Sequence, residues 1–236
     1  MMRPRRIFAA LGAAVMLMGQ TALDPQNPSC PAEPDWGPAN AMTLSTEVRG
    51  GKTVLIADGI INASLPDRLR QAINEDEMIE EIWLRSRGGD ASAGNEAGRV
   101  IRSFPGMLTR IPAGWTCFSA CNFVFMGGDR RHVEPGGIFM VHMFTHTSDR
   151  SIISESILDG TNATTELIAD IEQSSAMLAS EDNDFLIRMG ISRKLLTEVM
   201  YRQGAVRTDY NPSTRYCLSQ EEVRTYNVMP DERPSG

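Results

Sequence analysis

Short apolar runs and helical stripes alternate along the first half of the chain, and this alternation limits the possible folds more than any other feature. Residues 53–57, 79–84 and 108–111 have the length and composition of buried strands, and turn residues lie between them. Residues 65–75 and 93–104 instead repeat apolar side chains at helical spacing. Strands separated by single helices predict βαβ units, hence an α/β fold with a mostly parallel sheet.

The chain of 236 residues is long enough for one substantial domain, which we place at residues 46–229. Residues 1–22 resemble a signal peptide, because M-M-R-P-R-R precedes an apolar run. This predicts a periplasmic or secreted protein cleaved near Ala22, although Gln20 stands where a small residue is favoured, so a retained anchor is the alternative. Residues 23–45 are proline-rich and predict an extended arm, and residues 230–236 predict a disordered tail.

The charge balance limits the partners. The formal net charge is −7, and loss of residues 1–22 removes three arginines and no acid, which makes it −10. An acidic chain argues against a nucleic-acid partner, which needs clustered basic side chains, and against an anionic membrane surface. We therefore expect no nucleic-acid partner, and no stable membrane association once the signal is cleaved.

Four cysteines form an even set in a chain with an export signal, so disulfides are expected. Three connectivities are possible, and we expect Cys117 with Cys121 and Cys30 with Cys217. Metal ligation by Cys117 and Cys121 with His132 or His142 is the alternative. However, C-x-x-x-C is not the usual C-x-x-C pattern and no second pair follows it, so no metal is expected.

Ser119 and His142 are the candidate catalytic pair. Ser119 precedes an apolar run at a predicted strand-to-helix turn, and His142 ends the apolar run 138–141. If the side chains meet, they form a nucleophile and its base. The alternatives are a helix N-cap for Ser119 and a core histidine for His142. His132 lies in a charged turn and His146 in a polar stretch, so neither is preferred.

Several motifs together resemble the proteolytic subunit of Clp protease and the wider crotonase-like superfamily, over residues 54–228. S-R-G-G-D-A-S-A-G resembles the family's S-P-G-G-x-x-x-A-G, F-S-A-C its A-S-M-G, and P-G-G-I-F-M-V-H its P-N-S-x-x-M-I-H. R-Y-C-L-S-Q-E-E-V-R-T-Y-N-V resembles the closing R-x-L-S-x-x-E-A-x-E-Y-G-L-V. The resemblance implies a Clp/crotonase-like fold, a homo-oligomer, and a polypeptide substrate or partner protein.

The resemblance also assigns roles. Ser119 becomes the nucleophile and His142 the general base, and the backbone N–H groups of Gly88 and Ala120 form an oxyanion hole. The third member of the triad is Asp209, because the family's acid lies a few residues before the closing R-x-L-S motif. Asn211 is the alternative if the gap between this sequence and the family pattern is placed differently.

Three features depart from the family pattern. Arg87 replaces the proline before the glycines, Cys121 replaces a small residue, and export removes access to an ATP-driven unfoldase. The chain is in this respect similar to periplasmic Clp-like proteins that share its C-x-S-A-C signature.

These observations predict an exported serine hydrolase, an ATP-independent peptidase that needs no cofactor. A Ser-Lys dyad with Lys194 is a lower-ranked variant, because Lys194 lies on a predicted exposed helix. A non-catalytic binding protein that uses the same groove is the alternative from another class. An acyl-CoA enzyme ranks third, because export separates the protein from CoA.

Overall fold

The computed structural model describes residues 22–146, 149–204 and 214–230. Almost all of the predicted signal peptide and of the C-terminal tail lies outside these ranges. Within them, every helix is too short or too polar to span a bilayer.

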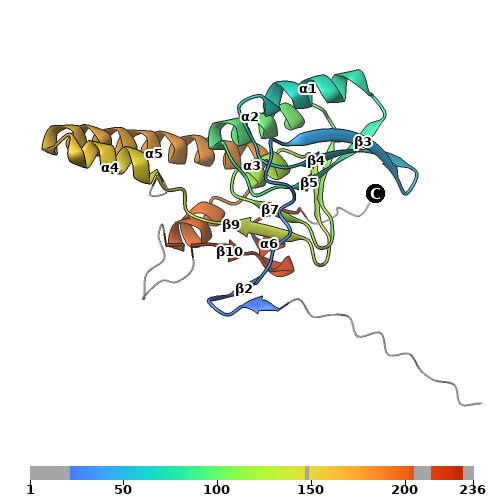
Figure 1. The fold of residues 1–236 in the computed structure, drawn as a ribbon. Coiled ribbons are helices and arrows are strands. Elements are labelled where there is room, and N and C mark those ends of the chain that lie inside the picture. The colour runs from blue at the N-terminus through green and yellow to red at the C-terminus, as the bar shows by residue number, and fades with distance from the viewer. Residues whose placement is uncertain (1–21, 147–148, 205–213, 231–236) are drawn as a thin grey trace, which may run out of the picture.

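A five-stranded sheet in the order β3-β4-β5-β6-β8 forms the centre of the molecule (Figure 1). Its strands are β3 (Thr43–Arg49), β4 (Lys52–Asp58), β5 (Ile79–Arg85), β6 (Leu108–Ile111) and β8 (Arg130–Val133). β4, β5, β6 and β8 run parallel, and only β3 is antiparallel to its neighbour. The mixed α/β architecture with a mostly parallel sheet confirms the predicted fold class.

A second, three-stranded sheet in the order β10-β9-β7 lies beside the first. It contains β7 (Thr116–Phe118), β9 (Ile138–Val141) and β10 (Tyr216–Cys217). β7 and β9 are parallel, and β10 is antiparallel to β9. A single parallel bridge between Ser86 and Cys117 joins the end of β5 to β7. The two sheets therefore meet where the candidate serine follows β7.

Three helices pack together on one side of the large sheet (Figure 1). They are α1 (Leu65–Glu75), α2 (Ala91–Arg102) and α3 (Cys121–Met126). α1 has the predicted bounds, and its apolar stripe is buried. Ser64 precedes α1 but does not cap it: its hydroxyl bonds Asn62 Oδ1 at 2.8 Å. Asp90 caps α2, because its carboxylate accepts a hydrogen bond of 2.9 Å from the Ala93 N–H.

The segment after β9 forms a helical arm that extends away from the sheets (Figure 1). It consists of two helices, α4 (Arg150–Leu158) and α5 (Thr161–Met189). A π-helical turn (Leu195–Val199) and a 3-10 turn (Met200–Arg202) follow. The closing helix α6 (Gln220–Thr225) begins with a capping box between Ser219 and Glu222.

The sheet begins earlier than the sequence indicated, within the segment expected to be an arm. β3 starts at Thr43, and Met42 is fully buried in the core. β3 is an edge strand exposed along nearly its whole length, so it lacks the apolar alternation that identifies half-buried strands. Gly50 and Gly51 both have positive φ, which is the geometry of a tight hairpin turn between β3 and β4.

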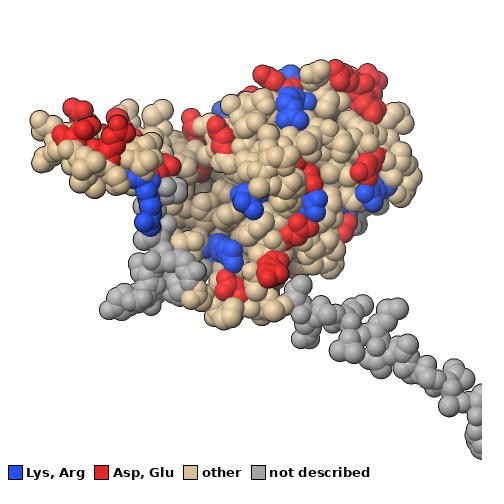
Figure 2. All heavy atoms as spheres, in the orientation of Figure 1, with Lys and Arg blue, Asp and Glu red and all other residues tan. Residues whose placement is uncertain are grey.

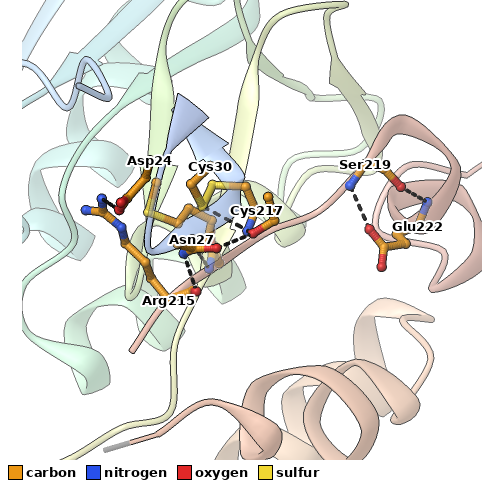
Figure 3. The surroundings of a disulfide bond; sticks show 10 residues. Asp24, Asn27, Cys30, Arg215, Cys217, Ser219 and Glu222 are labelled. Atoms are coloured by element: carbon orange, nitrogen blue, oxygen red, sulfur yellow. Dashed lines mark hydrogen bonds and ion pairs between the residues drawn. A yellow bond between two sulfur atoms is a disulfide. The ribbon is translucent and has the colours of Figure 1, made fainter. Parts of the chain in front are cut away.

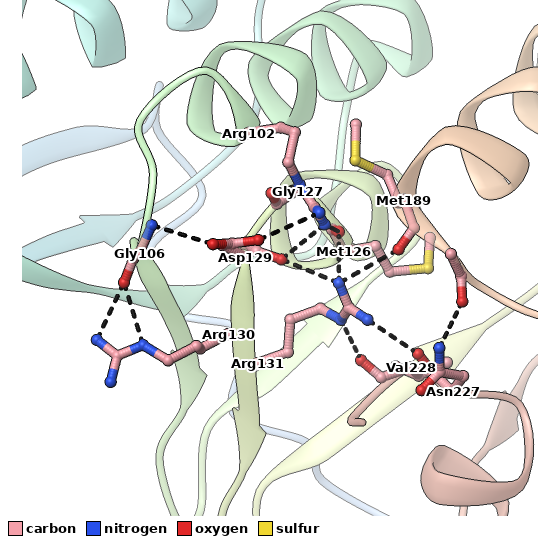
Figure 4. Close-up of polar contacts among 12 residues, drawn as sticks. Arg102, Gly106, Met126, Gly127, Asp129, Arg130, Arg131, Met189, Asn227 and Val228 are labelled. Carbon is pink, nitrogen blue, oxygen red and sulfur yellow. Dashed lines mark hydrogen bonds and ion pairs between the residues drawn. The ribbon is translucent and has the colours of Figure 1, made fainter. Parts of the chain in front are cut away.

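The predicted charged turn around His132 is instead strand β8, and its Arg131 is buried (Figure 4). The Arg131 guanidinium donates hydrogen bonds to the backbone carbonyls of Val228 (2.7 Å), Gly128 (2.9 Å) and Asn227 (3.1 Å). Burial, with a contribution from the positive charge of Arg102, lowers the pKa of Arg131 to about 10. Arg131 thereby connects the C-terminal segment to the large sheet. The sequence around Arg131 does not predict this contact, because its partners in that segment lie 96 and 97 residues further along the chain.

The N-terminal strands are attached to the C-terminal end of the domain (Figure 3). A disulfide joins Cys30 in β2 (Asn27–Pro31), which pairs with β1 (Leu23–Asp24), to Cys217 in β10. Arg215 forms an ion pair of 2.9 Å with Asp24, and its carbonyl accepts a hydrogen bond of 2.6 Å from Asn27. The second disulfide joins Cys117 and Cys121, so both expected pairings are present.

Figure 2 shows that acidic side chains gather on the helical arm, whereas basic side chains on this face are scattered singly. The gathering of acidic side chains on this face is consistent with the negative net charge of the chain.

Candidate active site

Ser119 occupies a sharp turn between β7 and α3. Its φ is +59°, in the left-handed region that non-glycine residues rarely adopt. Such backbone conformations persist where the surrounding structure enforces them, often at functional sites. Ser119 does not cap α3, because Ala120 holds the N-cap position and no side chain caps the helix. The turn presents the half-buried hydroxyl beyond the end of β7.

His142 is the first residue after β9 and meets Ser119. Because β7 and β9 are adjacent parallel strands, with Phe118 opposite Met140, their carboxyl ends lie at the same edge of the small sheet. The Nε2 atom of His142 lies 2.7 Å from Ser119 Oγ, which is hydrogen-bond distance. The Phe118 ring packs against the imidazole, with centroids 4.7 Å apart. Two residues 23 positions apart therefore form one polar pair.

The environment of His142 favours its neutral form. Burial lowers the pKa of the imidazole below its ordinary value of 6.5, and a hydrogen bond with the Met143 backbone opposes this effect. A neutral imidazole can accept the proton of a hydroxyl, so the ring is suited to act as a general base near pH 7.

Two candidate oxyanion donors lie beside the turn, and they differ in their present contacts. Among the described residues, the Ala120 N–H has no hydrogen-bond partner. The Gly88 N–H donates to Ser86 Oγ at 3.0 Å. Gly88 has φ +89°, and a Cβ at this position would come within 2.7 Å of the Phe118 carbonyl oxygen and of Ser119 Cβ. Only glycine fits against the turn at this position.

The serine turn is braced on two sides. The disulfide between Cys117 and Cys121 spans it, and both cysteines are fully buried. α2 approaches α3 closely behind the turn, because a Cβ on Gly94 would lie 2.6 Å from the Ala120 carbonyl oxygen. These contacts hold the backbone of Ser119 in its left-handed conformation.

The third member of the predicted triad, Asp209, and its alternative Asn211 both lie outside the described residues. Within the described ranges, no carboxylate forms a hydrogen bond with His142. Lys194, the variant base, is exposed and pairs with Glu198 at 3.6 Å. It is not among the residues that line the cavity beside Ser119.

The metal alternative does not fit the cysteines, because Cys117 and Cys121 are joined to each other. A cluster of three or more His, Cys, Asp or Glu side chains suited to a metal ion does not occur within residues 22–146, 149–204 and 214–230.

A cavity of about 200 Å³ opens beside the pair and brings in residues that sequence reasoning did not single out. One face of α5 lines it with Ser175, Leu178, Ala179 and Asp182. The spacing of these residues is that of one helix face, which was the available signal. Nothing in the sequence indicated that this face turns towards Ser119.

No protein-family model matches the chain, and no curated protein matches it. The chain does match solved structures. A ClpP1 mutant from Listeria monocytogenes matches with a TM-score of 0.50 and 15% identity, over 75% of this chain and 88% of that one.

Two further structures match less closely in shape. A membrane-bound stomatin-specific protease has a TM-score of 0.45 at 14% identity, over 75% of each chain. An enoyl-CoA hydratase from Shewanella pealeana has a TM-score of 0.44 at 13% identity, over 79% of this chain and 66% of that one. At such identities structural likeness shows the fold alone, and the chain has a Clp protease-like fold.

Proposed function

We propose that this chain is an exported serine hydrolase that cleaves polypeptides without ATP. The observation that carries the proposal is the 2.7 Å contact between Ser119 Oγ and His142 Nε2, made by a serine held in a left-handed turn. A structural serine needs neither the strained backbone nor an imidazole partner with a lowered pKa.

The geometry supports an acyl-transfer mechanism. Ser119 Oγ attacks the substrate carbonyl carbon while its proton passes to His142 Nε2. The Ala120 N–H donates to the developing oxyanion, and the Gly88 N–H joins it once it leaves Ser86 Oγ. The protonated imidazole then gives its proton to the leaving amine, which departs from the acyl-enzyme. His142 then deprotonates a water molecule that attacks the acyl carbon, and the imidazolium returns that proton to Ser119 Oγ as the acid is released. Asp209 would orient the imidazole through its second nitrogen.

The N-terminal sequence supports export to the periplasm or beyond, where no ATP is supplied to an unfoldase. Small or unfolded polypeptides are therefore the proposed substrates. The resemblance to Clp proteolytic subunits also supports a homo-oligomer. The arm of α4 and α5 carries exposed apolar side chains suited to contact another subunit, namely Ile152, Ile157, Leu158, Ile168 and Met177.

A fluorophosphonate probe tests the proposal, because it phosphonylates only serines activated for nucleophilic attack. The purified protein should take up one equivalent at Ser119, located by intact mass and peptide mapping. Ser119→Ala should take up none, whereas Ser64→Ala, which alters an exposed serine, should label like wild type. Absence of labelling in the wild-type protein would overturn the proposal.

The pH dependence of this labelling reports the state of His142. Because burial lowers the pKa of the imidazole, His142 stays neutral somewhat below pH 6.5. The labelling rate should therefore fall as the pH is lowered, and the midpoint of this fall should lie below pH 6.5. Stopped-time labelling between pH 4.5 and 8.5 measures the midpoint. A midpoint above 6.5 would contradict this expectation and show that burial does not dominate the pKa of the imidazole.

A second candidate, a binding protein that uses the same groove without catalysis, is favoured by one observation. The Gly88 N–H is already bonded to Ser86 Oγ, so one of the two oxyanion donors is occupied in this structure. Failure of Ser119 to react with the fluorophosphonate, combined with retained peptide binding, would favour this candidate.

A further inference from the structure

The cavity beside Ser119 and His142 combines apolar walls with one buried acid. Its walls include Phe123, Leu178, Ala179, Leu196 and Met200. Among the described residues that line it, Asp182 is the only acid, and none is a lysine or an arginine. Asp182 is buried, with 8% of its surface exposed. A buried carboxylate facing an apolar cavity is costly unless a partner compensates it.

The partners that Asp182 has within the protein leave it incompletely compensated. Its Oδ1 accepts one hydrogen bond of 2.8 Å from the Asn95 side-chain amide. No lysine or arginine of the described residues forms an ion pair with it. Asn95 is itself buried at 2% exposure, and its Oδ1 has no hydrogen-bond partner within the described part of the chain. Asn95 Oδ1 therefore lacks a donor, and the Asp182 carboxylate has one side-chain hydrogen bond and no ion pair within the described part of the chain.

The raised pKa of Asp182 is consistent with a buried carboxyl group that has few compensating partners. Burial raises the pKa of the carboxyl to about 6, against the lowering effects of the Asn95 hydrogen bond and of Arg99. The negative charge of Glu181 acts in the same direction as burial. Above neutral pH the group is still mostly ionised, so it presents a negative charge to the cavity.

Resting on the proposed hydrolase function, we infer that this cavity binds the substrate side chain on the acyl side of the scissile bond, and that Asp182 selects a lysine or arginine there. The apolar walls suit the methylene stem of such a side chain, and the cationic end can reach the carboxylate. A charge-assisted hydrogen bond to Asp182 would replace the missing ion pair. A volume of about 200 Å³ is sufficient for one side chain and not for several.

Two diphenyl phosphonate inhibitors that differ only in this side chain, lysine against the uncharged norleucine, test the inference. Both react with an activated serine, and intact mass spectrometry at pH 8 gives the rate of phosphonylation of Ser119. We expect the lysine compound to react about 10- to 100-fold faster with the wild-type protein, as a hydrogen bond to a buried charge predicts. In Asp182→Asn the ratio of the two rates should fall to about one.

Glu181→Gln is the matched control, because it removes one negative charge from the adjacent, exposed position of the same helix. Its rate ratio should equal that of the wild type. A wild-type ratio of one or less would overturn the inference, and so would an Asp182→Asn ratio as large as that of the wild type. If Asp182→Asn does not fold, the wild-type ratio decides alone.

The two proposals fail in different ways. A protein that reacts with the fluorophosphonate but with neither diphenyl phosphonate would overturn the assignment of the cavity and leave the hydrolase in place. A protein that reacts with none of the three would overturn the hydrolase itself.

Discussion

Replacing His142 by alanine should lower the rate of ester or peptide hydrolysis by roughly 10⁴- to 10⁶-fold, the range seen when the base of a serine triad is removed. The expected effect is large because an unassisted serine hydroxyl is a weak nucleophile at neutral pH. His142 Nε2, 2.7 Å from Ser119 Oγ, is the described group placed to take its proton. Hydrolysis of an activated ester, followed by absorbance, measures the loss in kcat/KM.

His132→Ala provides the matched control, since His132 lies on β8 in the other sheet. It should retain most of the activity. The double variant Ser119→Ala with His142→Ala should lose no more than either single variant, because the two residues act as one unit. Retention of a tenth or more of the activity in His142→Ala would show that another base activates Ser119.

Local pattern was sufficient to predict the elements around the candidate pair. α1 and β6 begin and end at the expected residues, and β9 delivers His142 at its carboxyl end as the sequence indicated. These elements are bounded by glycine, proline or charged turns, and their apolar residues follow one period. The Ser119 turn and its disulfide were likewise predictable, because the signal for both lies within a few residues.

Other parts of the site depend on contacts between distant residues and were not predictable. The Asn95 side chain meets Asp182, 87 positions later, and the sequence of α5 alone identifies neither partner nor cavity. The Gly88 N–H donates to Ser86 Oγ because the backbone of this turn has a positive φ at Gly88. The sequence shows that a glycine is present, but it does not determine the backbone angles of the turn. The assignment of Asp209 stays a prediction.

Removing the disulfide between Cys30 and Cys217 should destabilise the protein far more than removing the one beside Ser119. In the chain-entropy model, a cross-link between residues 187 positions apart contributes about 5 kcal/mol, whereas one across 4 positions contributes about 2 kcal/mol. The longer loop encloses nearly the whole described domain, including both members of the candidate pair, Ser119 and His142. We therefore expect Cys30→Ala with Cys217→Ala to lower the melting temperature by about 10–20 °C.

The variant Cys117→Ala with Cys121→Ala is the comparison, and its melting temperature should fall by only about 4–8 °C. The loss of activity should instead be greater for the Cys117→Ala, Cys121→Ala variant than for the Cys30→Ala, Cys217→Ala variant. The short disulfide braces the left-handed Ser119 turn, whereas the long one holds β10 against β9, next to the strand that ends at His142. Calorimetry, together with fluorophosphonate labelling at 25 °C, separates the two effects. Equal losses of stability in both variants would show that strain or residual structure in the unfolded chain, rather than loop length, governs these cross-links.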